Sequence, residues 1–495
     1  MLFNSFSFLL FLPIVFLLYW FVFNKHVRLQ NSFIVLVSYV FYGWWDWRFL
    51  SLIAFTTFCS WLSGLLIKNR RIKELGGDDT SSQRYCKMVV AANILINLSI
   101  LAYFKYANFF LESFIDLFGL FGLNPTYSTL KILLPVGISF YTFQALSYTI
   151  DVYRRKIEAT SDMVAFFAFV AFFPQLVAGP IERATHLLPQ FYKVRHFDYS
   201  EAVDGLRQIV WGLFKKVVVA DNCAMVANAV FSNAESANPS ALLLGAVMFT
   251  FQIYGDFSGY SDIAVGTAHL FNFKLMRNFN VPYFSRNIAE FWRRWHISLN
   301  TWFVDYVYIP LGGSRCGKWK TIRNTMIVFL VSGLWHGANW TYITWGIYHG
   351  LLFLPLLFLN KTKKYKGVVA EGHFLPSMAE CAQMLLTFVL VMFGWIIFRS
   401  ESIVFAVRYI VQMCSVEVFS APNTAMLGIG HSIVLGCFVF IFILLLVEWV
   451  QRDKRHGLDL VWMRSSFLRI GLYLGFVWLI LFFMGVQESF IYFQF

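Results

Sequence analysis

The sequence predicts an all-α membrane protein that crosses the bilayer many times. Hydrophobic residues make up 58% of its 495 residues and charged residues 14%, whereas soluble domains carry about 25% charged residues. Nearly uncharged runs that approach the ~20 residues needed to cross the hydrocarbon layer lie at 34–42, 88–104, 433–447 and 470–486. About ten to twelve such helices, with interfacial or re-entrant helices between them, would account for most of the chain.

The first 24 residues carry no charge. They have no basic region ahead of the apolar stretch and no small-residue cleavage site, so they predict a first span rather than a signal peptide. Lys25, His26 and Arg28 follow at once, and basic residues in short loops mark the cytoplasmic side. We therefore expect the N-terminus to face outward.

Short clusters of basic residues recur between the apolar runs. They predict cytoplasmic loops at 68–87, 154–156, 315–323, 361–366, 452–455 and 464–469. This arrangement places the C-terminus outside. The net charge of +13 then reflects membrane topology, and no nucleic-acid partner is predicted because the basic residues do not form one stripe.

No internal repeat, low-complexity tract or long linker divides the chain, so we predict one integral membrane domain over 1–495. The stretch 174–231 is ambiguous, because interfacial or re-entrant helices fit it as well as true spans. It mixes prolines and apolar patches with basic residues that include Arg183, Arg195, Lys215 and Lys216.

Common enzyme signatures are missing from the sequence. Seven scattered cysteines form no Cys-x-x-Cys pair, which predicts neither a disulfide framework nor a zinc or iron–sulfur site. There is no Gly-x-Ser-x-Gly elbow, Walker loop, dinucleotide fingerprint, His-Glu-x-x-His helix or His-x4-Asp pattern. We expect no metal, and any catalysis must use a different arrangement.

Two regions place polar groups in apolar surroundings, where such groups are costly and are candidate functional residues by default. The first begins at Glu290. On one helix His296 and Asn300 would share a face, as would Glu290 and Arg294. For Arg293 and Arg294 two readings stay open: a contact with a headgroup or cofactor phosphate, and an ion pair with Glu290.

The second region surrounds His336, with Trp335 and Asn339 beside it. A histidine that merely hydrogen-bonds a neighbouring helix is the structural alternative here. We favour a functional role for His336 because Gly333 and Gly337 flank it, and glycine lets another backbone or a substrate approach closely.

His349 follows thirteen residues after His336. At a helix rise of ~1.5 Å per residue, counted from Arg323 and back from Lys361, His336 would lie roughly 20 Å and His349 about 18 Å into the membrane. Two antiparallel helices would then carry imidazoles at similar depth. For His349 and Asn300 we favour the structural alternative.

Four further motifs carry a family resemblance. They are Met-Leu-Phe-Asn-Ser at 1–5, Leu-Pro-Val-Gly-Ile-Ser-Phe-Tyr at 134–141, Phe-Pro-Gln-Leu-Val-Ala-Gly-Pro-Ile at 173–181, and Gly-Asp-Phe-Ser-Gly-Tyr-Ser-Asp at 255–262. Together with the histidine regions they resemble the membrane-bound O-acyltransferases (MBOAT) over most of the chain. The resemblance is closest to the bacterial branch that contains alginate O-acetylase and the D-alanyl transfer protein of teichoic acid.

The resemblance implies an MBOAT fold with helices around a central tunnel and a catalytic core at about 130–360. His336 is the expected essential histidine, and His296, 40 residues earlier, takes the position where relatives carry Asn or His after Trp. A funnel from outside and a tunnel from the cytoplasm are expected to meet near His336. The expected substrate contacts are Asn300, Arg293, Arg294, Trp335, Asn339 and His349.

Gln144, 255–257 and 490–493 resemble the alginate-acetylase group more than the shorter D-alanine group. This implies acetyl-CoA as donor substrate without a bound cofactor, and an extracellular polysaccharide acceptor of the cell envelope, such as alginate. It also implies a periplasmic SGNH-type partner and a place among the lipids of the bacterial cytoplasmic (inner) membrane. Neutral His336 would act as general base on an acceptor hydroxyl, while His296 or Asn300 would polarise the thioester carbonyl or hold the acceptor.

Other readings stay open. The acceptor could be peptidoglycan, teichoic acid (D-alanyl transfer), lipopolysaccharide or a lipid. A transporter or flippase would also place broken helices and polar groups at the midplane, although no inverted repeat supports it. A structural partner with an inert histidine is a further possibility.

Overall fold

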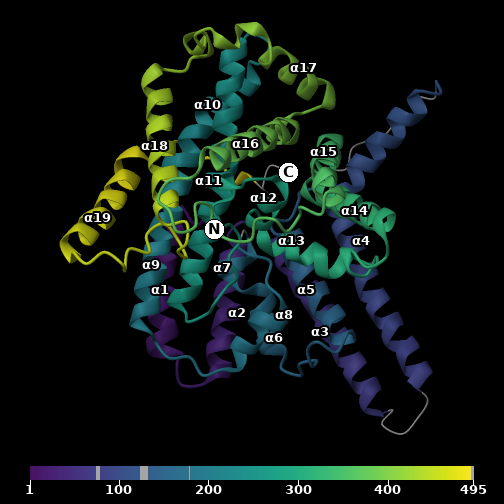
Figure 1. The fold of residues 1–495 in the computed structure, drawn as a ribbon. Coiled ribbons are helices and arrows are strands. Elements are labelled where there is room, and N and C mark those ends of the chain that lie inside the picture. The colour runs from purple at the N-terminus through teal and green to yellow at the C-terminus, as the bar shows by residue number, and fades with distance from the viewer. Residues whose placement is uncertain (74–78, 123–131, 178, 492–495) are drawn as a thin grey trace. The chain divides into compact units, whose positions relative to one another are not determined.

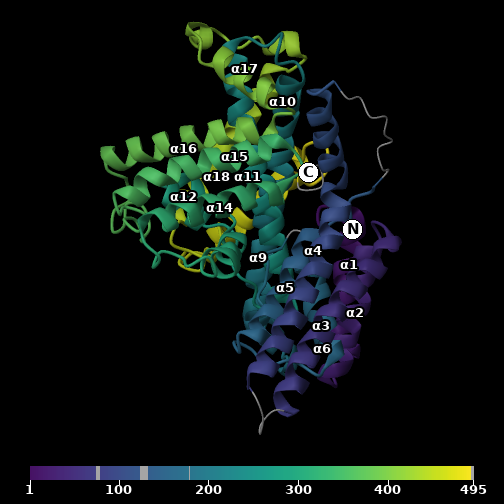
Figure 2. The ribbon, with the colours of Figure 1, turned by 90° about the vertical axis from the view of Figure 1, so that its right-hand side faces the viewer.

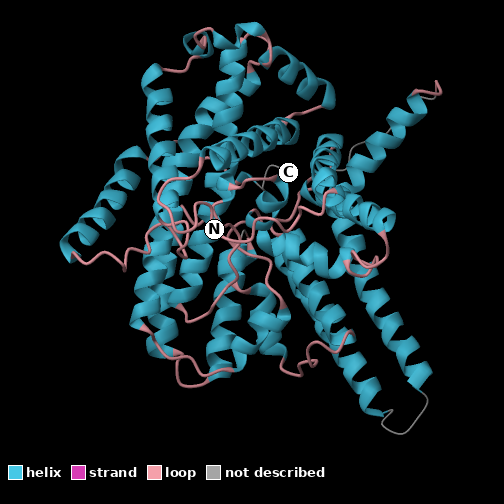
Figure 3. Cartoon of the chain, in the orientation of Figure 1, coloured by secondary structure: helices cyan, strands magenta, loops and turns pink. Residues whose placement is uncertain are grey.

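The computed structural model describes residues 1–73, 79–122, 132–177 and 179–491. These residues form helices and loops without a β-strand (Figure 3), which confirms the all-α class. They divide into two compact units, 1–202 with 267–276 and 203–266 with 277–495. The single domain over 1–495 and its core at about 130–360 stay predictions. Ala178, Tyr492 and Phe493 of the family motifs lie outside the described residues.

Seven helices among the described residues are long and apolar enough to cross a bilayer, which confirms a multi-pass membrane protein. They cover Trp47–Ile72, Thr80–Gly119, Pro239–Leu270, Trp340–Phe358, Met378–Arg399, His431–Val450 and Ser466–Phe483. The number is below the expected ten to twelve because other apolar helices are shorter. Examples are the segments Phe6–Val22 and Ile403–Met413.

The first unit begins with a bundle of helices. They are α1 (Phe6–Leu17) with a π-helical continuation (Leu18–Val22), α2 (Val27–Gly43), α3 (Leu50–Lys73), α4 (Asp79–Gly119), α5 (Ile138–Tyr153) and α6 (Met163–Ala171). α3 packs against α4 and α5, and α2 packs against α6 (Figure 1). The α3–α5 contact is close because Gly64 lies directly under the Tyr148 ring.

The stretch 174–192 forms short helices rather than spans. They are α7 (Phe173–Leu176), α8 (Ala184–Leu187) and a 3-10 helix (Leu188–Tyr192). The break between α6 and α7 is stabilised by two buried amides, because Gln144 and Gln175 donate to the Phe169 carbonyl at 2.8 and 2.7 Å. This satisfies a carbonyl that the interrupted helix would otherwise leave unpaired.

Close glycine contacts organise the start of the second unit. Its first elements are α9 (Tyr199–Leu213), the π-helix η4 (Phe214–Ala220), α10 (Asp221–Ser232) and α11 (Pro239–Leu270). A Cβ at Gly259 of α11 would lie 2.8 Å from the Gly212 carbonyl oxygen, and one at Gly255 would lie 2.8 Å from the Lys215 carbonyl oxygen. Small residues therefore let the two backbones touch, as is common between membrane helices.

The rest of the second unit carries both histidine regions. It contains α12 (Ile288–Arg294), α13 (Ile297–Phe303), a π-helical turn (Val304–Tyr308), α14 (Lys318–His336), α15 (Trp340–Phe358), α16 (Met378–Arg399), α17 (Ile403–Met413), α18 (His431–Val450) and α19 (Ser466–Phe483). α14, α15 and α16 lie side by side (Figure 2). Asn339 separates α14 from α15 and caps the latter.

Gly259→Ala is expected to destabilise the protein by about 1–3 kcal/mol, because the added methyl group overpacks the contact with Gly212 and Lys216. Thermal unfolding of the detergent-solubilised protein measures this. Gly475→Ala in α19 is the control, since a Cβ there meets nothing within 4 Å and alanine favours the helix by about 0.5–1 kcal/mol. A similar drop in Tm for both variants would contradict the proposed contact.

Candidate active site

His296 lies at a sharp break between α12 and α13. Its backbone has φ 44° and ψ 54°, a left-handed conformation that residues other than glycine rarely adopt. Two hydrogen bonds hold the break: the Ile297 N–H donates to the Asn278 carbonyl at 2.9 Å, and the Asn300 N–H donates to the His296 carbonyl at 3.0 Å. The expected helix with His296 and Asn300 on one face is wrong, because α13 begins at Ile297 and His296 precedes it in a left-handed conformation.

Asn278 determines which nitrogen of His296 carries the proton. Its side-chain oxygen accepts from the Ser298 N–H at 3.4 Å and from the Ser298 hydroxyl at 3.0 Å. The same oxygen lies 3.0 Å from Nδ1 of His296, so Nδ1 donates and Nε2 of the neutral ring is an acceptor. Burial lowers the pKa of His296 to about 3, which keeps the ring neutral at physiological pH.

His336 is the last residue of α14 and is 4% exposed. Aromatic rings surround it, with centroid distances of 4.9 Å to Trp335, 5.0 Å to Trp345 and 5.3 Å to Phe398. All three contacts are edge-on. These three neighbours are uncharged aromatic side chains.

The two glycines beside His336 serve the packing of α14 against α15. A Cβ at Gly333 would overlap the carbonyl oxygen of Tyr342, and a Cβ at Gly337 would overlap the Tyr342 ring. We expected Gly333 and Gly337 to let another group approach His336 closely, and the group that approaches these glycines is helix α15. Access of substrate at this point stays a prediction.

Two tryptophans connect the three histidines. The Trp335 ring lies 5.8 Å from His296 and 4.9 Å from His336. The Trp345 ring lies 5.0 Å from His336 and 5.1 Å from His349. The tertiary structure thus places one ring between each neighbouring pair of histidines.

His349 is fully buried, and neither of its ring nitrogens has a hydrogen-bond partner within the described ranges. It lies nine residues into α15, which is about 14 Å along the helix from the turn where His336 ends α14. The two histidines therefore lie at different positions along the hairpin, in which Gly350 packs against Met326. Their similar depth in the membrane stays a prediction.

The amides of the two predicted asparagines bind nearby backbone. Asn300 donates to the carbonyls of Trp292 and Trp295, both at 2.6 Å. Asn339 begins α15, where its side-chain oxygen accepts from the Thr341 N–H at 2.9 Å. Both side chains thus stabilise turns of the chain, and their contact with substrate stays a prediction.

Arg293 and Arg294 hold different partners. Arg293 donates to the carbonyls of Thr362 and Tyr365, both at 2.5 Å, in the loop after α15. Arg294 forms an ion pair with Glu290 at 2.9 Å. Two interpretations were open for Arg294, and the structure shows the ion pair with Glu290.

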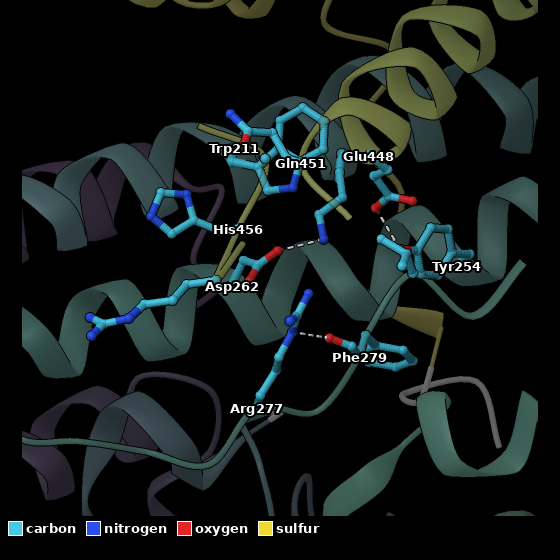
Figure 4. Close-up of a pocket in the computed structure, with 12 residues that line it drawn as sticks. Trp211, Tyr254, Asp262, Arg277, Phe279, Glu448, Gln451 and His456 are labelled. Carbon is cyan, nitrogen blue, oxygen red and sulfur yellow. Dashed lines mark hydrogen bonds and ion pairs between the residues drawn. The ribbon is translucent and has the colours of Figure 1, made fainter. Parts of the chain in front are cut away.

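Figure 4 shows a polar pocket of the second unit, with Phe279 among the residues that line it. Phe279 lines this pocket and also stacks on the His296 ring at a centroid distance of 6.4 Å. The titratable side chains that line the pocket include Lys215, Asp262, Arg277, Glu448, Arg455 and His456.

Most charges of this polar pocket are compensated. Lys215 pairs with Asp262 at 2.5 Å, and the Tyr254 hydroxyl donates to Glu448 at 2.5 Å. Figure 4 also shows Arg277, which donates to the Phe279 carbonyl at 2.6 Å. The pocket therefore combines a paired interior with cationic groups that can meet an anionic ligand.

Sequence reasoning assigned no role to the polar pocket. The sequence feature that could have indicated buried ion pairs in this region is charge inside apolar stretches. Lys215 and Lys216 lie in the apolar stretch 209–220, and Asp256 and Asp262 lie in the long apolar helix α11. Charged residues in such surroundings are expected to pair or to serve function. Which lysine meets which carboxylate could not be deduced, because these pairings are set by the packing of separate helices.

The fold defines a multi-pass helical membrane protein, and sequence comparison defines the family. A sequence profile of the membrane-bound O-acyltransferase family (MBOAT) matches residues 42–362. The chain belongs to this family, which confirms the resemblance and makes it a multi-pass membrane O-acyltransferase.

Three relatives illustrate the range of the family. A protein of Pseudomonas aeruginosa named "Probable alginate O-acetylase AlgI" is 42% identical over 84% of this chain and 75% of its own length. A peptidoglycan O-acetyltransferase of Helicobacter pylori is 31% identical over 98% of this chain and 95% of its own length. A teichoic acid D-alanyltransferase of Bacillus subtilis is 30% identical over 56% of this chain and 71% of its own length.

Asn278→Ala is expected to destabilise the protein by about 1–3 kcal/mol, because His296 and the Ser298 hydroxyl lose their buried acceptor. Thermal unfolding of the solubilised protein measures the effect. Asn233→Ala is the matched control: this exposed side chain bonds only its own helix, so the change should stay within about 0.5 kcal/mol. Equal losses in both variants would refute the role assigned to Asn278.

Proposed function

We propose that this protein is an acetyltransferase that takes acetyl from cytoplasmic acetyl-CoA and passes it to an extracytoplasmic polysaccharide, of the kind represented by alginate-like exopolysaccharide. Membership of the family supports acyl transfer, and the names of the acetylating relatives support the acetyl group. The acetyl group would reach the glycan directly or through a periplasmic SGNH-type partner. The observation that carries the proposal is buried His336, one tryptophan ring from His296.

His336 acts as the general base in the proposed step. It removes the proton of the acceptor hydroxyl while the hydroxyl oxygen forms an ester bond with the acetyl carbon. The carbon–sulfur bond breaks, and the thiolate of coenzyme A takes the proton back from His336, so atoms and charge balance. Because a thiol pKa is about 8.5 on the cysteine scale, the thiolate leaves without a strong general acid.

His296 is suited to hold the acceptor rather than to polarise the thioester carbonyl. Its Nδ1–H donates to Asn278, so Nε2 can only accept a hydrogen bond while the ring is neutral. Asn300 directs its amide nitrogen at two backbone carbonyls. This geometry supports an acceptor hydroxyl as the ligand of His296 and gives no support to a carbonyl-polarising role for Asn300.

The polar pocket is the proposed site for the phosphates of acetyl-CoA. Its lining contains Lys215, Arg277 and Arg455 beside Asp262 and Glu448, and ammonium and guanidinium groups bind phosphate. Arg455 also lies 3.9 Å from Asp204, with which a phosphate would compete. The basic cluster that contains Arg455 is expected on the cytoplasmic side, from which the donor comes. Phe279 separates this pocket from His296.

His336→Ala is expected to lower acetyl transfer by about 10²–10⁴-fold, the usual contribution of a general base. Transfer of label from radioactive acetyl-CoA in membranes, with and without added polysaccharide, measures it. His296→Ala should lose less activity, and His431→Ala, at an exposed position that begins α18, should keep wild-type activity. Full activity in His336→Ala would contradict the assignment of His336 as general base and would favour the alternative that the protein is a transporter.

The same labelling experiment tests the acceptor. Alkali-labile label on purified polysaccharide supports the proposed product, because base cleaves the O-acetyl ester. Label found only on peptidoglycan, teichoic acid or lipid would overturn the polysaccharide assignment while leaving acyl transfer intact. If the folded wild-type protein does not turn over the thioester, acyl transfer from acetyl-CoA itself is overturned.

Arg455→Gln is expected to raise the KM for acetyl-CoA by about three- to tenfold with little change in kcat, since a single charge-assisted contact to phosphate is lost. The side chain is 69% exposed, so folding should tolerate the change. Lys454→Gln removes the same charge next to the pocket without lining it and serves as control. An equal rise in both variants would indicate general electrostatics rather than a donor contact.

A further inference from the structure

Three charged residues meet in the interior of the second unit: Lys216 of η4, Asp221 of α10 and Asp256 of α11, each at most 3% exposed. The ammonium of Lys216 lies 2.8 Å from Asp221, 2.5 Å from Asp256 and 3.2 Å from the Glu488 carbonyl oxygen. An ammonium has three donors, so each can meet one acceptor. The proposed acyl-transfer chemistry uses none of these groups.

The cluster also holds the segment that follows α19. The Ile491 N–H donates to the second oxygen of Asp256 at 2.6 Å. Near the start of the same segment, the Gly485 N–H donates to the Val217 carbonyl at 2.8 Å. Phe490 and Ile491 are 0% and 1% exposed, so the end of the segment 484–491 is buried in the interior.

This segment reaches the candidate active site through two aromatic contacts. The Phe490 ring packs on Tyr260 at 4.3 Å and on Phe257 at 6.0 Å. Phe257 in turn meets the His296 ring edge-on at 4.7 Å. Two consecutive residues of α11 therefore have linked contacts: Asp256 binds the segment 484–491, and Phe257 contacts His296.

We propose that Lys216 and Asp256 are positioning residues for acyl transfer: their ion pair anchors the segment 484–491, and the anchored Phe490 holds Phe257 against His296. Removing one partner leaves a buried charge without compensation, which strongly disfavours the packed arrangement. The catalytic consequence rests on the proposed function, whereas the anchoring does not.

Hydrogen exchange of the full-length protein in detergent tests the anchor. In the wild type the hydrogen-bonded amides of Gly485 and Ile491 should exchange slowly. In Lys216→Met and Asp256→Ala they should exchange at least about tenfold faster because the segment is released. Exchange in α16, which touches neither residue, serves as the internal control. Unchanged protection of the segment in both variants would overturn the anchor.

Acetyl-transfer kinetics test the positioning role with a milder change. Phe490→Leu keeps the ion pair but removes the ring that holds Phe257, so kcat should fall about tenfold, as small misplacements of reacting groups allow. The KM for acetyl-CoA should not change, because the polar pocket is untouched. Phe467→Leu, at an 86% exposed position of α19, is the control and should keep both constants.

Wild-type kcat in Phe490→Leu would overturn the positioning role, and so would a loss that merely follows a lower Tm. Failure of the proposed function looks different: the wild type itself would transfer no acetyl group. In that case the exchange experiment still decides whether Lys216 and Asp256 anchor the segment.

Discussion

Charge compensation in an apolar interior is the constraint on which the second unit depends. An ion removed from water without a partner costs several kcal/mol, and the buried lysines and Arg294 of this unit have carboxylate partners: Lys215 with Asp262, Lys216 with Asp256 and Arg294 with Glu290. Two of these pairs join η4 to α11, whose backbones touch at glycines. Ion pairing and glycine packing thus require the same arrangement of the two elements.

With the charges paired elsewhere, aromatic rings surround the histidines. This setting excludes water, and under the proposed function it would protect an acyl group from hydrolysis. Burial lowers the pKa of His296 to about 3, far below the working range of a general base. Because burial keeps the His296 ring neutral, this ring can accept a hydrogen bond. In the proposed function, His296 and His336 therefore have different roles.

Much of the fold could be predicted because hydropathy and motif content are local properties. The long apolar helices at 80–119 and 431–450 follow from composition alone. The prediction for His296 and Asn300 failed because it assumed that helical spacing continues through the region. The left-handed turn at His296 is held by Asn278, 18 residues earlier, which no local pattern indicates.

Packing also decided where the histidines lie along the α14–α15 hairpin and which side chains line the polar pocket. The register of α14 on α15 follows from glycine contacts with Tyr342 and Met326, whereas the depth estimate used basic residues as surface markers. The pocket combines side chains from η4, α11 and α18 with the loop after α18. Its charges were visible in the sequence, but their pairing was not.

The sequence by itself determined the helical membrane class and the MBOAT family, because apolar runs and short motifs consist of consecutive residues. It also indicated His336 and His296 as candidate site residues, and their catalytic roles stay predictions. Only the tertiary structure decided that Trp335 lies between the two histidines, that Asn278 orients one of them, and that Lys216 reaches Glu488, 272 residues away. The physical reason is that these contacts come from the packing of distant segments, which is set by shape and charge compensation between helices.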